Sequence, residues 1–129
     1  RRRGRIKPLL LNQRFLAGLG NIYTDEALWR AGVHPLRTAD TLTSAEVRRL
    51  HQAIRSVLRA AIASGGTTLP DRTYLQADGQ TGEFAGRLAV YGREGQVCPR
   101  CGTSVERIRV SQRGTHFCPR CQPLPGAKL

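Results

Sequence analysis

The sequence is poor in aromatic residues and contains no methionine. Aromatic side chains account for 5% of its 129 residues. No hydrophobic run is long enough to cross a membrane, and no segment resembles the apolar core of a secretory signal. Because the sequence has no methionine and opens on three arginines, we expect it to be a piece of a longer protein.

Acidic residues are also scarce, and this scarcity gives the chain a strong positive charge. Nine acids face 21 basic residues, for a formal net charge of +12. Lysine occurs only at positions 7 and 128, so almost all of this charge belongs to arginine. A basic surplus directs a protein toward polyanions, above all nucleic acid, and the planar guanidinium suits phosphate. A membrane-surface role is disfavoured, because no helix pairs a basic face with bulky aromatics. Solubility alone and a ribosomal-type RNA contact remain open.

All four cysteines fall in two copies of one tetrapeptide, Cys98-Pro99-Arg100-Cys101 and Cys118-Pro119-Arg120-Cys121. Two Cys-x-x-Cys turns at this spacing are typical of a closed, structural Zn²⁺ site with Cys98, Cys101, Cys118 and Cys121 as ligands. The alternatives are two local disulfides, which would strain tight turns, or a pair of redox motifs. Thiolate ligands also favour a reducing, intracellular compartment. The sequence therefore predicts one zinc ion, whose binding folds the last third of the chain.

A first helix is predicted over residues 22–31. Asn21 is a good N-cap, the acids Asp25 and Glu26 suit the positive end of the helix dipole, and Gly32 ends the helix. A helix start flanked by glycines is also a ready anion site. Asn21 can thus cap the helix, bind a phosphate, or do both, and the sequence alone favours capping.

A second and longer helix is predicted from a capping box, with Thr43 at the N-cap and Glu46 at N3, to about Ser64. Its opposite face carries arginines that we expect to be solvated. Its apolar residues recur every three or four positions and form one stripe: Val47, Leu50, Ile54, Val57, Leu58, Ala61 and Ile62.

The rest of the chain is predicted to form a loop and a metal-bound hairpin. Residues 65–86 are expected to form a long glycine-rich loop whose most distinctive parts are Arg72-Thr73-Tyr74 and residues 78–82. Residues 88–91 are expected to be a short strand or an extended entry to the metal module, and residues 105–110 and 115–118 to be paired strands. Arg113 then projects from the hairpin tip over residues 111–114, where it is either a phosphate contact or an ordinary exposed arginine. The expected organisation is a helical domain (1–64), a loop with a connecting strand (65–92), a finger (93–122) and a frayed tail (123–129).

Several motifs in a fixed order resemble one family, the C-terminal half of bacterial formamidopyrimidine-DNA glycosylase. The resemblance runs from about Arg3 to Gln122, and the formamidopyrimidine branch fits better than the sister endonuclease VIII branch. The motifs that carry it, besides the four cysteines with Gln112-Arg113, are Lys7-Pro8-Leu9-Leu10-Leu11, Gly18-Leu19-Gly20-Asn21-Ile22-Tyr23, Asp25-Glu26-Ala27-Leu28, His34-Pro35, Gly65-Gly66-Thr67-Thr68 and Tyr91-Gly92-Arg93.

This resemblance implies a fold: a mainly α helix–two-turns–helix domain followed by a small zinc-bound β-hairpin finger. It also implies site residues. Lys7, Asn21 and Arg113 would contact phosphates that flank a lesion, and Tyr91 would join them. Arg72, Thr73 and Tyr74 would belong to the loop that reads the flipped base, although Pro70 stands where many members carry lysine.

The family's full enzyme removes oxidised purines, such as 8-oxoguanine and formamidopyrimidines, from double-stranded DNA, and then cleaves the abasic strand. Its N-terminal proline nucleophile and neighbouring glutamate have no counterpart in this sequence. The resemblance therefore implies that this chain is a monomeric part of a bacterial cytoplasmic, nucleoid-associated enzyme. It would partner an N-terminal catalytic domain and bind damaged DNA without catalysis. The alternative is a non-enzymatic zinc-finger module that binds nucleic acid.

Overall fold

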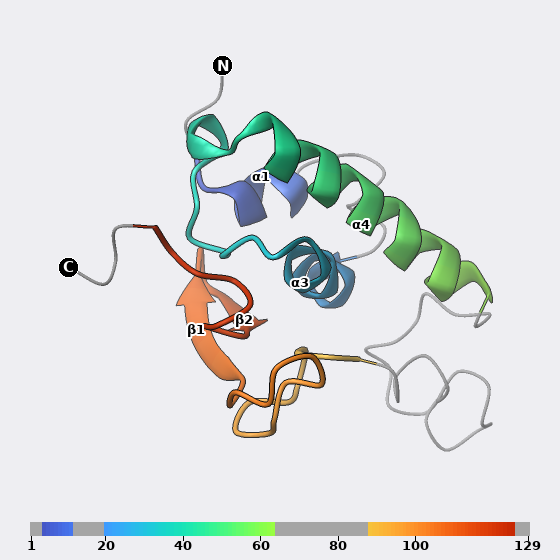
Figure 1. Cartoon of the computed structure of the whole chain (residues 1–129), viewed down its shortest axis with the longest axis vertical. Helices are drawn as coiled ribbons and strands as arrows, with labels where there is room; N and C mark the ends of the chain where they lie inside the picture. Colours follow the sequence, from blue (N-terminus) through green and yellow to red (C-terminus); the bar gives the residue numbers. More distant parts are fainter. Residues whose placement is uncertain (1–3, 12–19, 64–87, 126–129) are drawn as a thin grey trace.

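The computed structural model describes residues 4–11, 20–63 and 88–125, and the side chains of residues 61–63 and 11 are not among those described. Over these residues the helices are α1 (Ile6–Leu11), α3 (Gly20–Ala31), the 3₁₀ turn η1 (Ala39–Thr41) and α4 (Ser44–Ala63). A hairpin of β1 (Glu106–Val110) and β2 (Arg113–Phe117) follows. Helix α3 lies at the centre, with α4 on one side and the hairpin on the other (Figure 1). The architecture agrees with the predicted α domain followed by a small β-hairpin.

The predicted capping box of α4 is present. The Glu46 backbone N–H donates to Thr43 Oγ1 at 3.1 Å, and the Thr43 N–H donates to Glu46 Oε1 at 2.8 Å. Along the helix Leu50, Ile54 and Val57 are buried in the core shared with α3, as the apolar stripe predicts. Val47 departs from the prediction, because it is 50% exposed. Polar contacts of Glu46 hold the first turn instead.

Helix α3 begins earlier than predicted, at Gly20, whose φ of 74° lies in the left-handed region that favours glycine. Asn21 therefore lies inside the first turn and does not cap it, so the favoured capping role is wrong. The helix ends in a Schellman motif, in which the Gly32 N–H donates to Trp29 O at 3.1 Å and the Val33 N–H to Leu28 O at 3.0 Å. Gly32 ends the helix as predicted.

Residues 88–91 form no strand, so the strand alternative for this segment is wrong. The backbone N–H groups of Ala89, Val90 and Tyr91 each donate at 2.9 Å to the carboxylate of Glu26 on α3. One side chain thus accepts the hydrogen bonds that a neighbouring strand would otherwise provide. Burial raises the pKa of Glu26, and these three donors oppose that shift.

The hairpin is tighter than predicted. Val110 pairs with Arg113, so its turn is only Ser111 and Gln112, with φ of 50° and 67°. Two consecutive left-handed residues are typical of a type I′ turn, whose twist matches that of the paired strands. Arg113 is consequently the first residue of β2 and does not lie within the turn.

The core consists of two clusters that share helix α3. The larger cluster packs α1, α3 and α4 around buried residues such as Tyr23, Leu28 and Val57. The smaller cluster contains Ala89, Val90, Val105 and two of the cysteines, and Trp29 of α3 packs against it. Among the described residues, no helix has the length and apolar character needed to span a bilayer.

One polar contact of α4 yields a prediction about pH. Arg37, 7% exposed, holds Glu46 through two hydrogen bonds, Nη1 to Oε2 at 2.9 Å and Nη2 to Oε1 at 2.8 Å. The hydrogen bonds from Arg37 lower the pKa of Glu46 from 4.5 to about 2. Since the folded-state pKa lies below the unfolded value, the ionised carboxylate stabilises the fold above pH 4.5. That contribution is lost as the pH falls toward 2.

Replacing Glu46 by Gln should therefore lower the melting temperature most at neutral pH, and the difference from the parent chain should shrink below pH 4.5. Thermal unfolding across this pH range measures it. Loss of zinc in acid affects both chains alike and cancels in the difference. The matched control is Glu106→Gln on exposed β1, which should change little. If the melting temperature of Glu46→Gln is lowered by the same amount at every pH, the stabilising role of the ionised Glu46 carboxylate is contradicted.

Candidate zinc centre and nucleic-acid interface

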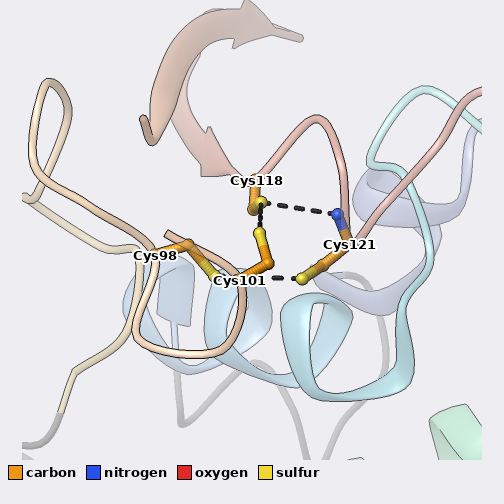
Figure 2. A group of neighbouring side chains, drawn as sticks. All are labelled: Cys98, Cys101, Cys118 and Cys121. Carbon is orange, nitrogen blue, oxygen red and sulfur yellow. Dashed lines mark hydrogen bonds between the residues drawn. The ribbon is translucent and has the colours of Figure 1, made fainter. Parts of the chain in front are cut away.

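The four cysteines predicted as metal ligands come together in space. Their Sγ atoms all lie within 4.8 Å of one another, and Figure 2 shows them converging from two turns. The Arg100 N–H points at Cys98 Sγ at 3.4 Å, and the Cys121 N–H at Cys118 Sγ at 3.4 Å. Donors aimed at sulfur stabilise thiolates. The cluster therefore fits a tetrahedral, four-thiolate zinc site with no open position.

The ionisation of the four thiols also explains why this site needs a cation. Hydrogen bonding to Thr103 lowers the pKa of Cys101 to about 6, whereas burial raises the pKa of Cys118 to about 12. Four thiolates in this space repel one another and lose solvation, so they are not stable together without a cation. Zinc would be held by all four sulfurs and would supply a structural cross-link between the two turns.

A second polar cluster joins α1 and α3 to strand β2, and it contains the predicted DNA-binding residues. Lys7 of α1 is fully buried, and its Nζ lies 2.8 Å from Asp25 Oδ1. The same ammonium donates to Thr115 Oγ1 at 2.8 Å and to the Gly114 carbonyl at 3.1 Å. Burial lowers the pKa of Lys7, and the Asp25 carboxylate beside it opposes the shift. The ammonium is thus engaged within the protein.

Asn21 reaches the same point of the hairpin. Its Nδ2 donates to the Gly114 carbonyl at 2.8 Å, so two side chains from two helices hold one backbone oxygen. Its Oδ1 is buried without a hydrogen-bond partner among the described residues. Arg113 directly precedes Gly114, and its side chain is exposed. The cluster therefore fixes the backbone next to Arg113 and leaves the guanidinium in solvent.

Tyr91 joins this cluster through His116 of β2. The two rings meet edge to face with centroids 4.6 Å apart. The backbone N–H of His116 donates to Asp25 Oδ2 at 3.0 Å, and its Nδ1 lies 3.1 Å from the same oxygen. The structure thus gathers Lys7, Asn21, Tyr91 and Arg113 in one region. The predicted base-reading residues Arg72, Thr73 and Tyr74, and the unusual Pro70, lie outside the described residues.

Three residues that the sequence does not mark as functional hold this arrangement together. Asp25 and Glu26 fit a helix dipole by their position in the sequence, but they are 1% and 2% exposed and accept hydrogen bonds from distant segments. Gln122 is fully buried, where its Oε1 accepts from the Cys118 N–H at 2.8 Å and its Nε2 donates to Val33 O at 2.9 Å. An adjacent acidic pair between apolar helix residues was the available signal for the first two. Nothing in the sequence marks Gln122.

The geometry thus defines a class: a helical domain joined to a four-cysteine zinc finger. The family model for the formamidopyrimidine-DNA glycosylase H2TH domain matches residues 1–73. The model for the zinc finger found in FPG and IleRS matches residues 95–124. The chain belongs to the formamidopyrimidine-DNA glycosylase family, and it carries one structural zinc site.

Individual relatives support the same assignment. The chain is 56% identical over 124 residues to the formamidopyrimidine-DNA glycosylase of Enterococcus faecalis, covering 96% of this chain and 44% of that protein. It is 58% identical over 117 residues to that of Thermus thermophilus, covering 91% and 44%. It thus spans less than half the length of these curated relatives.

Solved structures of DNA complexes share the fold. A complex between Lactococcus lactis Fpg and DNA with an abasic site gives a TM-score of 0.83 at 43% identity, covering 96% of this chain and 44% of that one. MutM in complex with DNA that contains carbocyclic 8-oxo-G gives 0.82 at 43% identity, covering 95% and 43%.

The buried Lys7–Asp25 pair yields a second prediction. Lys7→Met leaves the Asp25 carboxylate buried without its cation, which should cost roughly 3–5 kcal/mol of folding free energy. Denaturant unfolding of the zinc-loaded chain measures the loss. Adding Asp25→Asn to Lys7→Met removes the unpaired charge and should recover part of the stability. A Lys7→Met chain as stable as the parent, or a double variant no better than the single one, would contradict a buried structural pair.

Proposed function

We propose that this chain is the DNA-binding part of a base-excision-repair DNA glycosylase and AP lyase that removes oxidised purines. In this proposal it binds double-stranded DNA at an abasic or oxidised site. The family assignment supports this function, as do similar solved structures that contain DNA with an abasic site, an 8-oxo-G analogue or FAPY-dG. The last two of these lesions derive from guanine, a purine.

The observation that carries the proposal is that the backbone beside Arg113 is held in place while its side chain is exposed. Lys7 and Asn21 anchor the Gly114 carbonyl beside it, while the guanidinium stays exposed. An exposed guanidinium on a rigid backbone suits a phosphate, because the backbone that carries it is already ordered before the phosphate binds. The start of α3 lies beside it, since Asn21 reaches the Gly114 carbonyl, and the first turn of a helix can offer its backbone N–H groups to an anion. We propose that these two elements hold the phosphates on either side of an extruded nucleotide.

Within this proposal Lys7 and Asn21 differ in role. Asn21 Nδ2 carries two hydrogens and uses one on Gly114, so the amide retains a donor for a phosphate. Lys7 is fully buried and already has three partners. We therefore propose that Lys7 acts by positioning the hairpin and that direct contact belongs to Asn21 and Arg113, with Tyr91 alongside. Arg72, Thr73 and Tyr74 remain the proposed base-reading residues.

The chemistry is proposed to come from elsewhere in the protein. The proline nucleophile and glutamate that the family uses have no match in this sequence, so a separate catalytic domain is the proposed partner. The chain alone would bind damaged DNA as a monomer without excising a base. Its relatives are bacterial, and four thiolates suit a reducing compartment, which supports a cytoplasmic, nucleoid-associated location.

The first test compares two duplexes. Fluorescence anisotropy of the zinc-loaded chain should show tighter binding to a duplex with a tetrahydrofuran abasic analogue than to the intact duplex. The physical reason is that an unpaired site is cheaper to open and bend than a stacked base pair. Single-stranded RNA of the same length is the control for general polyanion binding. Equal affinity for both duplexes would assign only backbone affinity to this chain, and tighter RNA binding would favour an RNA module.

The second test removes Arg113. Arg113→Ala should weaken binding by roughly 1–3 kcal/mol and reduce the slope of log K against log salt by about 1, while leaving the melting temperature unchanged. The matched control is Arg55→Ala, because Arg55 is an exposed arginine on α4, across α3 from the hairpin. If both variants bind equally well, Arg113 is not part of the interface.

A further inference from the structure

The two Cys-Pro-Arg-Cys repeats are identical in sequence but not in their surroundings. Arg100, in the first repeat, folds back over α3: its Nη2 donates to the Trp29 carbonyl at 2.6 Å, and its Nε points at Cys121 Sγ at 3.3 Å. Arg120 holds the equivalent place in the second repeat. It is exposed, and its guanidinium makes no hydrogen bond or ion pair within the described part of the chain. The side chain of Arg100 therefore contacts a sulfur of the metal site, and the side chain of Arg120 does not.

Trp29 approaches the same site from α3. Its indole Nε1 donates to Cys98 Sγ at 3.3 Å, and the Arg100 guanidinium stacks on its ring with Cζ 4.0 Å from the centroid. Trp29 also packs against the smaller core cluster, which contains Cys98 and Cys118. Two side chains, in contact with each other, thus donate to two different sulfurs.

These donors compensate the negative charge of the metal site. Four thiolates around Zn²⁺ leave a net charge of about −2, and two of the sulfurs belong to cysteines that are 2% and 0% exposed. A buried negative charge is costly unless hydrogen bonds or cations compensate it. Arg100 brings a positive charge to Cys121, and Trp29 brings a polarised N–H to Cys98. Such outer partners strengthen a metal site and alter the electron density on its ligands.

We propose that Trp29 and Arg100 are outer-shell residues of the zinc centre, which stabilise the Cys98 and Cys121 thiolates and make helix α3 part of the metal site. Arg100 positions Trp29 by stacking on its ring and by holding its carbonyl. Zinc binding is thereby coupled to the C-terminal end of the helix whose N-terminal end carries Asn21.

The test uses variants that separate the donors from the packing. Trp29→Phe keeps an aromatic ring and removes the N–H. Arg100→Met removes the charge and the fork, and Arg100→Lys keeps the charge alone. Arg120→Met, in the identical tetrapeptide, is the matched control. Zinc affinity is measured by competition with a chromophoric chelator, and cobalt(II) replaces zinc for absorption spectra.

Trp29→Phe and Arg100→Met should each weaken zinc binding about 10-fold or more. Each should also move the sulfur-to-cobalt charge-transfer band to lower energy, since a sulfur that loses a hydrogen bond gives up an electron more readily. Arg100→Lys should recover part of the affinity, and Arg120→Met should leave affinity and band position unchanged. Because Trp29 is the only tryptophan, removal of zinc from the parent chain should also change its fluorescence.

Parent-like zinc affinity and cobalt spectra in Trp29→Phe and Arg100→Met would overturn the proposal. Equal effects of Arg100→Met and Arg120→Met would overturn it for Arg100, because they would reflect surface charge alone. The visible d–d bands of tetrahedral cobalt report whether each variant holds the metal in a folded site. If Trp29→Phe does not fold, the exposed Arg100 and its control Arg120 decide the outcome.

Discussion

The structure depends on two adjacent carboxylates that are buried in the middle of helix α3. Asp25 forms an ion pair with Lys7 and accepts a hydrogen bond from the backbone of His116, so it joins α1 to β2. Glu26 accepts three backbone N–H groups of residues 89–91 and so fixes the segment that leads into the finger. Buried carboxylates are expensive unless they are fully paired, and each pairing here reaches a different segment of the chain. Loss of either would weaken the attachment of the finger to the helices.

This constraint makes α3 the element that connects the two proposed sites. Its first turn, with Asn21, meets the hairpin beside Arg113, and its last turn, with Trp29, meets the cysteine cluster. The Schellman ending at Gly32 lies against the finger backbone, where an added Cβ would sit 3.2 Å from Cys121 O. The hairpin and the cysteine cluster therefore contact the two ends of the same helix. The finger and the helical domain are best understood as one unit that zinc completes.

Short sequence motifs correctly predicted the structural features that depend on interactions between neighbouring residues. The capping box at Thr43 and Glu46 and the glycine that ends α3 follow from bonds between near neighbours, and the structure confirms them. The convergence of the two Cys-x-x-Cys turns is also confirmed, because the spacing of the cysteines is itself typical of a zinc site. Asn21 misled for a local reason: a favourable local cap lost to a carbonyl 93 residues away. Residues 88–91 form no strand, because the buried Glu26 offers their N–H groups an acceptor. Val47 followed the helical period yet lies beyond the reach of the core.

The sequence by itself determined the family, the zinc ligands and the helix and hairpin elements, because spacing and periodicity act over a few residues. Only the tertiary structure decided that Lys7 is buried, that Asp25 and Glu26 are anchors, and that the Arg100 side chain contacts a ligand sulfur while the Arg120 side chain does not. Identical tetrapeptides cannot differ in local preference. Their arginines differ here because Trp29 of α3 lies beside Arg100, and burial and charge are set by which distant segments meet.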